Sequence, residues 1–151
     1  MTPTAIADFM ASLFTHWPQT VCLLDPGAGV GSLTESFVER FLAKASAGAS
    51  LEAQCYEIEP LLQDYLSDHL REIGARCKSQ GHHFNSTIHS RDFIAEASFE
   101  IGMGAPRFTH AILNPPYKKI GTDSAHRKML RQVGIETVNL YTAFLGLAVA
   151  M

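Results

Sequence analysis

The sequence predicts an open α/β fold with a mainly parallel sheet. Short apolar runs that suit buried strands alternate along the 151 residues with segments whose apolar residues recur at helical spacing. This alternation is typical of βαβ units, in which consecutive strands lie parallel. In addition, the most distinctive polar segments, at 25–31, 57–59, 92–93 and 114–117, each follow a predicted strand. Since such folds bind ligands at the carboxyl ends of their strands, this coincidence predicts a site there.

The first third of the chain is expected to form a helix, a strand and a second helix. Apolar residues recur at helical spacing over 6–14, with Thr2 or Thr4 as the N-cap. The apolar run 21–24 is typical of a buried strand. The helix that follows it is expected to have Ser32 as its N-cap and Leu33, Phe37 and Phe41 on its inner face.

The middle of the chain is expected to form a second strand at 51–56 and a helix over 62–73 that is stopped by Gly74. The polar stretch 77–85 is expected to be a loop, and 86–90 a weaker third strand.

The last third is expected to contain a fourth strand at 109–113, a short helix around 127–133 and an apolar helix over 138–150. An apolar helix in this position should lead into another central strand, and none follows. We therefore expect a sheet that is incomplete in this chain, with residues 1–151 as the N-terminal part of a longer domain.

Composition describes a globular chain and excludes several other classes. Hydrophobic residues at 46% and charged residues at 18% exclude a disordered chain. The apolar stretch 143–151 falls far short of the roughly 20 residues that cross a membrane, and the N-terminus has no secretory signal. Cys22, Cys55 and Cys77 are widely spaced, so we expect reduced thiols in a cytoplasmic protein and no metal site.

A glycine loop, residues 25–31 with the sequence DPGAGVG, follows the first predicted strand. Its glycines let the backbone approach a ligand closely. The spacing differs from the dinucleotide fingerprint G-x-G-x-x-G, because Ser32 follows Gly31, and the loop also lacks the lysine of a Walker motif. Asp25, at the tip of the strand, can take a cationic group such as an ammonium. The alternative is a simple glycine-rich turn.

Two further pairs of residues follow the second and third predicted strands. Glu57 can accept hydrogen bonds from both hydroxyls of a ribose, and Ile58 offers an apolar face for a base. Asp92 can accept from the amino group of an adenine, and Phe93 offers a ring for stacking. The alternative for Glu57 is a solvated acid at a strand end, and the Asp92–Phe93 pair is the least distinctive segment.

The most informative segment is 114–117, Asn-Pro-Pro-Tyr, directly after the fourth predicted strand. Prolines have no backbone N–H, so the turn is stiff and leaves carbonyl groups unpaired. Asn114 and the Pro115 carbonyl can therefore accept hydrogen bonds from a planar amino group, while Tyr117 can stack on the ring that carries it. The alternative is an ordinary proline turn at the end of a strand.

Together these segments resemble the class I S-adenosylmethionine-dependent methyltransferases, and Asn-Pro-Pro-Tyr resembles their amino-methyltransferase signature. The order of the segments narrows the likeness to the gamma-class DNA adenine-N6 methyltransferases of restriction–modification systems. Thr2-Pro3 with 6–11 resembles the motif before the glycine loop of that group, and 139–145 resembles the helix after its catalytic loop.

The resemblance implies a Rossmann-like sheet and S-adenosylmethionine as cofactor. The residues implied to contact the cofactor are Thr2, Pro3, Asp25, Gly27, Ala28, Gly29, Glu57, Ile58, Asp92 and Phe93. Thr2 and Pro3 would lie over its methionine end, the glycine loop would wrap it, and Glu57 would hold the ribose. The residues implied to be catalytic are Asn114, Pro115, Pro116 and Tyr117, which would hold and stack on a flipped base.

A basic segment follows the catalytic loop. Five of the twelve lysines and arginines lie between 118 and 131, namely Lys118, Lys119, Arg127, Lys128 and Arg131. We expect them to contact DNA phosphates near the flipped nucleotide, the alternative being a solvated basic loop.

The resemblance therefore implies an enzyme that methylates the N6 amino group of adenine in double-stranded DNA, with a cognate restriction endonuclease as a possible partner and no metal. Two alternatives stay open. Asn-Pro-Pro-Tyr also suits methylation of ribosomal RNA or of a protein glutamine, because each presents a planar amino group. The chain could also be an inactive cofactor-binding fragment, since the target-recognition domain of the gamma order is expected beyond residue 151.

Overall fold

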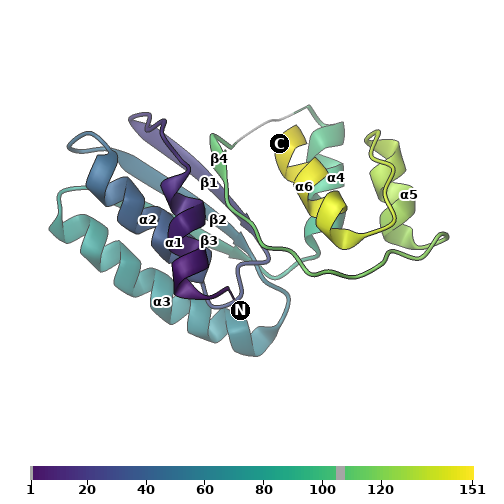
Figure 1. Cartoon of the computed structure of the whole chain (residues 1–151), viewed down its shortest axis with the longest axis horizontal. Coiled ribbons are helices and arrows are strands. Elements are labelled where there is room, and N and C mark those ends of the chain that lie inside the picture. The colour runs from purple at the N-terminus through teal and green to yellow at the C-terminus, as the bar shows by residue number, and fades with distance from the viewer. Residues whose placement is uncertain (1, 105–107) are drawn as a thin grey trace.

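A four-stranded sheet in which every strand pair is parallel forms the centre of the computed structural model, which describes residues 2–104 and 108–151 (Figure 1). The strands are β1 (Thr20–Pro26), β2 (Ser50–Tyr56), β3 (His83–His89) and β4 (His110–Ala111). Their order in the sheet is β3-β2-β1-β4. The chain therefore moves outward from β1 to β3 and returns to the other side of β1. In open α/β sheets this reversal creates the crevice in which ligands bind, here at the carboxyl ends of β1 and β4.

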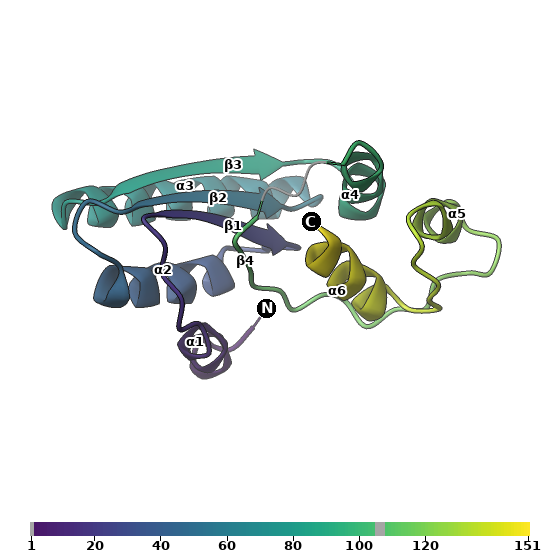
Figure 2. The same cartoon turned by 90° about the horizontal axis from the view of Figure 1, so that it is seen from above.

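Three helices pack on one face of the sheet, namely α1 (Thr4–Ser12), α2 (Ser32–Lys44) and α3 (Pro60–Ser79) (Figure 2). Side chains alternate between the two faces of a strand, so Leu23 joins this core while its neighbour Leu24 joins the other. Phe37 and Phe41 of α2 are completely buried, as their helical spacing predicted. The helix α1 lies against α2 through the buried Ala7 and Ala11.

A second group of helices lies beyond the carboxyl ends of the strands (Figure 2). Its members are α4 (Phe93–Gly102), α5 (Ala125–Gln132) and α6 (Leu140–Ala150). The fully buried Leu130 of α5 and Leu147 of α6 share a core with Ile94 of α4. Because α6 follows the segment after β4, this core fixes the chain on both sides of the predicted catalytic loop.

Several predicted boundaries were wrong. Gly74 does not stop the second long helix, which continues to Ser79, and β3 begins at His83 inside the stretch predicted as a loop. The reason is that Gly74 faces β3: a Cβ there would lie 3.3 Å from Cδ1 of Phe84, so the glycine allows helix and strand to approach closely. The sequence also gave no indication of α4.

Helix caps were also predicted incorrectly. Neither Thr2 nor Thr4 caps α1, whose N-cap is Pro3. Ser32 does not cap α2, whose N-cap is Gly31 with a φ of 88°.

The fourth strand was predicted over five residues and is regular only at His110–Ala111. Hydrogen bonds from Thr109 and Ile112 to β1 extend its pairing by one residue on each side.

No helix in the described part of the chain is both long and apolar enough to cross a membrane. Within the same residues, no cluster of three or more histidine, cysteine or acidic side chains is placed to hold a metal ion. Cys22, Cys55 and Cys77 are free thiols.

Candidate active site

The glycine loop is fastened to the end of β2. The backbone N–H groups of Gly27 and Ala28 both donate to the carbonyl oxygen of Tyr56, at 2.8 and 2.9 Å. The loop then turns through Gly29 and Gly31, whose φ angles of 58° and 88° lie in the region that favours glycine. This path directs the loop backbone toward the start of α2 and leaves its outer side open to a ligand.

Glu57 supports the glycine loop from the next strand end. Its side chain is almost completely buried, and its two carboxylate oxygens accept hydrogen bonds from the N–H groups of Gly29 and Glu59, each at 2.9 Å. Each oxygen keeps a second lone pair, so the carboxylate can still accept from a ribose hydroxyl. Ile58 beside it is 59% exposed and available to an apolar ring.

Asp25 lies beneath the loop and is completely buried. Its Oδ2 accepts a hydrogen bond from the Thr34 hydroxyl at 2.7 Å, while Oδ1 has no hydrogen-bond partner among the described residues. Burial raises the pKa of Asp25 to about 7, and the neighbouring charge of Glu57 acts in the same direction, against the bond from Thr34. Asp25 is therefore a buried acid with one oxygen left to stabilise a nearby positive charge.

A cavity of about 270 Å³ opens over the glycine loop, and Asn114 forms part of its wall. The residues that line it are Thr2, Gly27, Ala28, Gly29, Val30, Ser32, Leu33, Leu62 and Asn114. Val30, Ser32, Leu33 and Leu62 were missed by the sequence analysis, although the first two adjoin the glycine loop. Because Ser32 and Leu33 begin the 13-residue α2, the free N–H groups there favour an anionic part of a ligand.

The segment 114–120 is joined to the chain before α6. The Lys118 carbonyl accepts from Leu140 N–H, and Ile120 N–H donates to the Val138 carbonyl, both at 2.8 Å. Asn139 caps α6 by accepting from the backbone N–H of the third residue after it at 2.8 Å. The loop is thus held at both ends, by β4 and by α6.

Tyr117 is 81% exposed and stacks on Tyr141, with ring centroids 5.2 Å apart and an interplanar angle of 14°. One face of Tyr117 is therefore occupied, and its exposure leaves the other available. Tyr141 was missed as a candidate site residue, although it lies in the segment 139–145 that carried part of the family resemblance. Asn114 and Pro116 are exposed, whereas Pro115 is buried.

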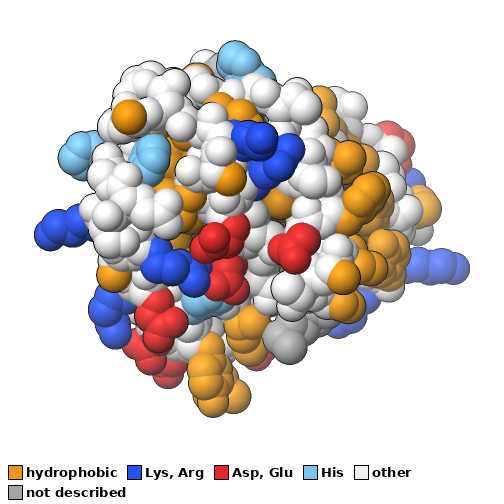
Figure 3. All heavy atoms as spheres, turned by 60° about the vertical axis from the view of Figure 1, so that its left-hand side comes forward, with side chains coloured by type: hydrophobic (Ala, Val, Ile, Leu, Met, Phe, Trp, Pro, Cys, Tyr) orange, Lys and Arg blue, Asp and Glu red, His pale blue; other side chains and the backbone are white. Residues whose placement is uncertain are grey.

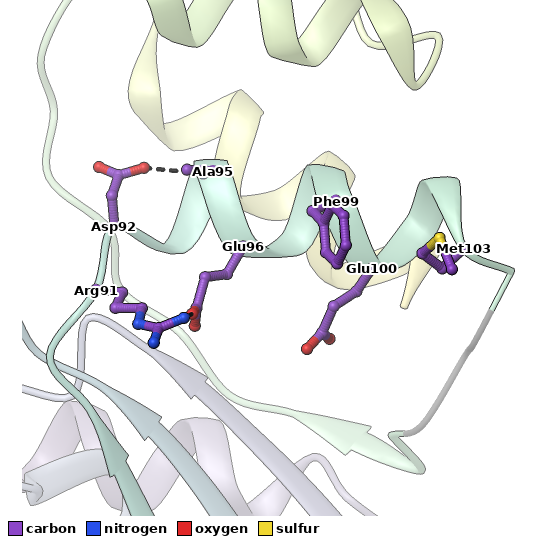
Figure 4. A pocket seen from close by; sticks show the side chains of 7 residues that line it. All are labelled: Arg91, Asp92, Ala95, Glu96, Phe99, Glu100 and Met103. Atoms are coloured by element: carbon purple, nitrogen blue, oxygen red, sulfur yellow. Dashed lines mark hydrogen bonds and ion pairs between the residues drawn. The ribbon is translucent and has the colours of Figure 1, made fainter.

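Asp92 and Phe93 were predicted to bind the adenine of the cofactor. Asp92 caps α4 by accepting from Ala95 N–H at 2.9 Å (Figure 4). Its other oxygen is 3.1 Å from Nε2 of His126. It lines a separate cavity of about 540 Å³ along α4. Phe93 is 3% exposed, packed with ring centroids 5.0 Å from both Tyr56 and Phe144. Neither residue lines the glycine-loop cavity, and their contact with the cofactor stays a prediction.

The basic segment divides into two groups. Lys118, Lys119 and Lys128 are exposed. Arg127 and Arg131 instead share Glu136, whose pKa their hydrogen bonds lower to about 2. On the side where α2 and α3 lie, positive and negative side chains are interspersed, so that face shows no continuous basic surface (Figure 3).

No protein-family model matches the chain. The chain is 43% identical over 156 residues to Type II methyltransferase M.BsuBI of Bacillus subtilis and 38% identical over 152 residues to Type II methyltransferase M.PstI of Providencia stuartii. These alignments cover 98% and 99% of the chain. The chain spans only 30% and 29% of the length of these two relatives.

Two solved structures share the fold. A modification subunit of a putative type I restriction enzyme from Vibrio vulnificus has a TM-score of 0.66 at 15% identity, over 99% of this chain and 30% of that one. A putative class I S-adenosylmethionine-dependent methyltransferase from Listeria monocytogenes has a TM-score of 0.60 at 16% identity, over 98% of this chain and 42% of that one. The predicted fold class is confirmed.

Proposed function

From the premise that this chain is homologous to type II methyltransferases over nearly its whole length, we propose that the protein methylates DNA in a restriction–modification system. The methyl group would come from S-adenosylmethionine and the acceptor would be the N6 amino group of a flipped adenine. One observation carries the proposal: Asn114 of the amino-methyltransferase signature lines the same cavity as the glycine loop. Donor and acceptor of a methyl group need this closeness, since the reaction depends on positioning.

The residues around the cavity fit S-adenosylmethionine. The start of α2 suits its carboxylate, and the unpartnered Oδ1 of the buried Asp25 lies under the loop where a positive charge would be stabilised. Glu57 keeps acceptor capacity for the ribose hydroxyls while it holds Gly29. At the adenine end, Asp92 would have to exchange or share its bond with His126.

When bound, the cofactor supplies a methyl group on a positively charged sulfur, an already activated leaving group. Asn114 Oδ1 and the Pro115 carbonyl would accept hydrogen bonds from the target amino group. These bonds draw its lone pair out of conjugation with the ring and stabilise the positive charge that develops on nitrogen. Tyr117, backed by Tyr141, would stack on the flipped base and offset part of the few kcal/mol lost on unstacking.

The matching segment of the 43% identical relative can be exchanged for this chain, and the chimera assayed with tritiated S-adenosylmethionine and duplex DNA. We expect label in N6-methyladenine after digestion to nucleosides, and loss of label in the Asn114→Ala chimera. A cofactor-binding chimera that labels cytosine, RNA or protein glutamine instead would contradict the assignment of the target.

A further inference from the structure

The side chain of Asn114 is tied to the N-terminus of the chain. Its Nδ2 donates to the hydroxyl oxygen of Thr2 at 3.1 Å, across a sequence separation of 112 residues. Within the described residues, no other group forms a hydrogen bond with this side chain. Its Oδ1 is therefore left to accept a bond from a target amino group.

The orientation of this amide decides what it can bind. The two ends of an asparagine amide are nearly equal in shape but opposite in chemistry, since oxygen accepts and nitrogen donates. With Oδ1 toward the target, an amine N–H finds an acceptor. After a half-turn of the amide, the amine would meet another donor and no bond would form. Asn114 is exposed, so packing alone does not select between the two orientations.

A hydroxyl group selects an orientation only when its own hydrogen is engaged. If the hydrogen of Thr2 is free, the hydroxyl can either accept from Nδ2 or donate to a reversed Oδ1. If the hydrogen is donated elsewhere, the hydroxyl can only accept. Thr2 lines the cavity together with Ser32 and Leu33 at the start of α2, where an anionic group is favoured. A carboxylate in this cavity is a natural acceptor for the Thr2 hydrogen.

We infer that Thr2 is a positioning residue: by donating to the carboxylate of S-adenosylmethionine, its hydroxyl fixes the Asn114 amide with Oδ1 toward the target amine. Cofactor binding thereby prepares the catalytic loop for the base. The inference rests on the proposed function and deepens it, because it connects the cofactor site to the catalytic amide through one side chain.

Thr2 is held where this role requires. The Pro3 carbonyl next to it accepts from Ile6 and Ala7 N–H, both at 3.0 Å, which starts α1 directly after Thr2. Farther along α1, Asp8 accepts from the Ser36 hydroxyl of α2 at 2.7 Å. The helix α2, whose start forms the anion-favouring end of the cavity, thus also anchors α1, which Thr2 precedes.

The test compares the binding of S-adenosylmethionine and of its decarboxylated analogue to the wild-type chain and to two variants. Thr2→Val loses the hydroxyl at nearly constant shape, and Thr2→Ser keeps it. Calorimetry gives the preference for the carboxylate-bearing ligand. Nitrogen-15 NMR follows the two Nδ2 protons of Asn114, assigned by their absence from Asn114→Ala. We expect Thr2→Val to reduce the preference about ten-fold, the loss of one hydrogen bond to a charged group.

In the wild type and in Thr2→Ser, we expect S-adenosylmethionine to shift the Asn114 side-chain signals and the analogue to leave them nearly unchanged. In Thr2→Val the shift should be lost. If Thr2→Val kept both the preference for S-adenosylmethionine and the shift of the Asn114 signals, the inference would be overturned and the proposed function would stand. The same conclusion would follow if Thr2→Ser behaved like Thr2→Val. If Thr2→Val fails to fold, equal shifts from both ligands in the wild type would still refute it. Failure of the folded wild type to bind S-adenosylmethionine would overturn the proposed function as well.

Discussion

Replacing Glu57 with glutamine should weaken both the fold and the cofactor site. The carboxylate accepts from Gly29 and Glu59 N–H at 2.9 Å, and the side chain is almost completely buried. Glutamine keeps one acceptor oxygen and places an NH₂ group against the other backbone donor. One bond to a charged acceptor is lost, so we expect the free energy of unfolding to fall by about 2 kcal/mol. For a chain of this size that lowers Tm by roughly 4–8 °C.

Glu52→Gln is the matched control, since Glu52 lies on β2, the strand that Glu57 follows, and is exposed, with a bond from Gln54 at 2.8 Å. Its unfolding free energy should stay within about 0.5 kcal/mol of the wild type. Thermal unfolding checks both variants, and calorimetric titration should show S-adenosylmethionine bound about ten-fold more weakly by Glu57→Gln, for one lost ribose bond. If Glu57→Gln matched Glu52→Gln in stability and cofactor affinity, the reasoning about this carboxylate would be refuted.

Three further predictions concern the loop, its buried acid and the basic segment. Gly31→Ala should be less stable than Gly48→Ala by about 1 kcal/mol or more, because both glycines have positive φ but only at Gly31 would a Cβ meet a side chain, at 2.9 Å. Denaturant unfolding of both variants measures this difference, and equal losses of stability would contradict the prediction. Asp25, whose pKa is raised to about 7 on folding, binds a proton more tightly in the folded state than in the unfolded state. The unfolding free energy should therefore decline from about pH 4 to pH 7 by up to about 1.4 kcal/mol per pH unit. Asp25→Asn should remove that decline in a pH series of unfolding curves. Replacing Lys118 and Lys119 together with alanine should reduce the slope of log affinity for DNA against log salt by about two, measured by fluorescence anisotropy, and an unchanged slope would place DNA phosphates elsewhere.

The sequence predicted the parts of the fold that depend on local pattern. Alternating strands and helices gave the parallel sheet, and the buried Phe37 and Phe41 followed from helical spacing. Whether a helix continues through a glycine is not a local property. Gly74 is retained within α3 because Phe84 of β3 packs against it, and no nearby residue reveals that contact.

The candidate site, like the fold, was predictable only where it depends on local pattern. Segments at strand ends converge because parallel strands end at one edge, so the glycine loop and Asn114 share a cavity, to which Thr2 before α1 also contributes. Side-chain partnerships were not predictable, since they depend on the exact placement of helices after the sheet. Asp92 pairs with His126, and Tyr117 stacks on Tyr141, through contacts that only the docking of α5 and α6 creates.

The most direct test of the central claim is calorimetric titration of this chain with S-adenosylmethionine, with NAD as the control ligand and circular dichroism to establish that the chain is folded. The glycine spacing and the Asn114 cavity predict saturable binding of S-adenosylmethionine and none of NAD. A folded chain that binds neither ligand, or that prefers NAD, would contradict the account.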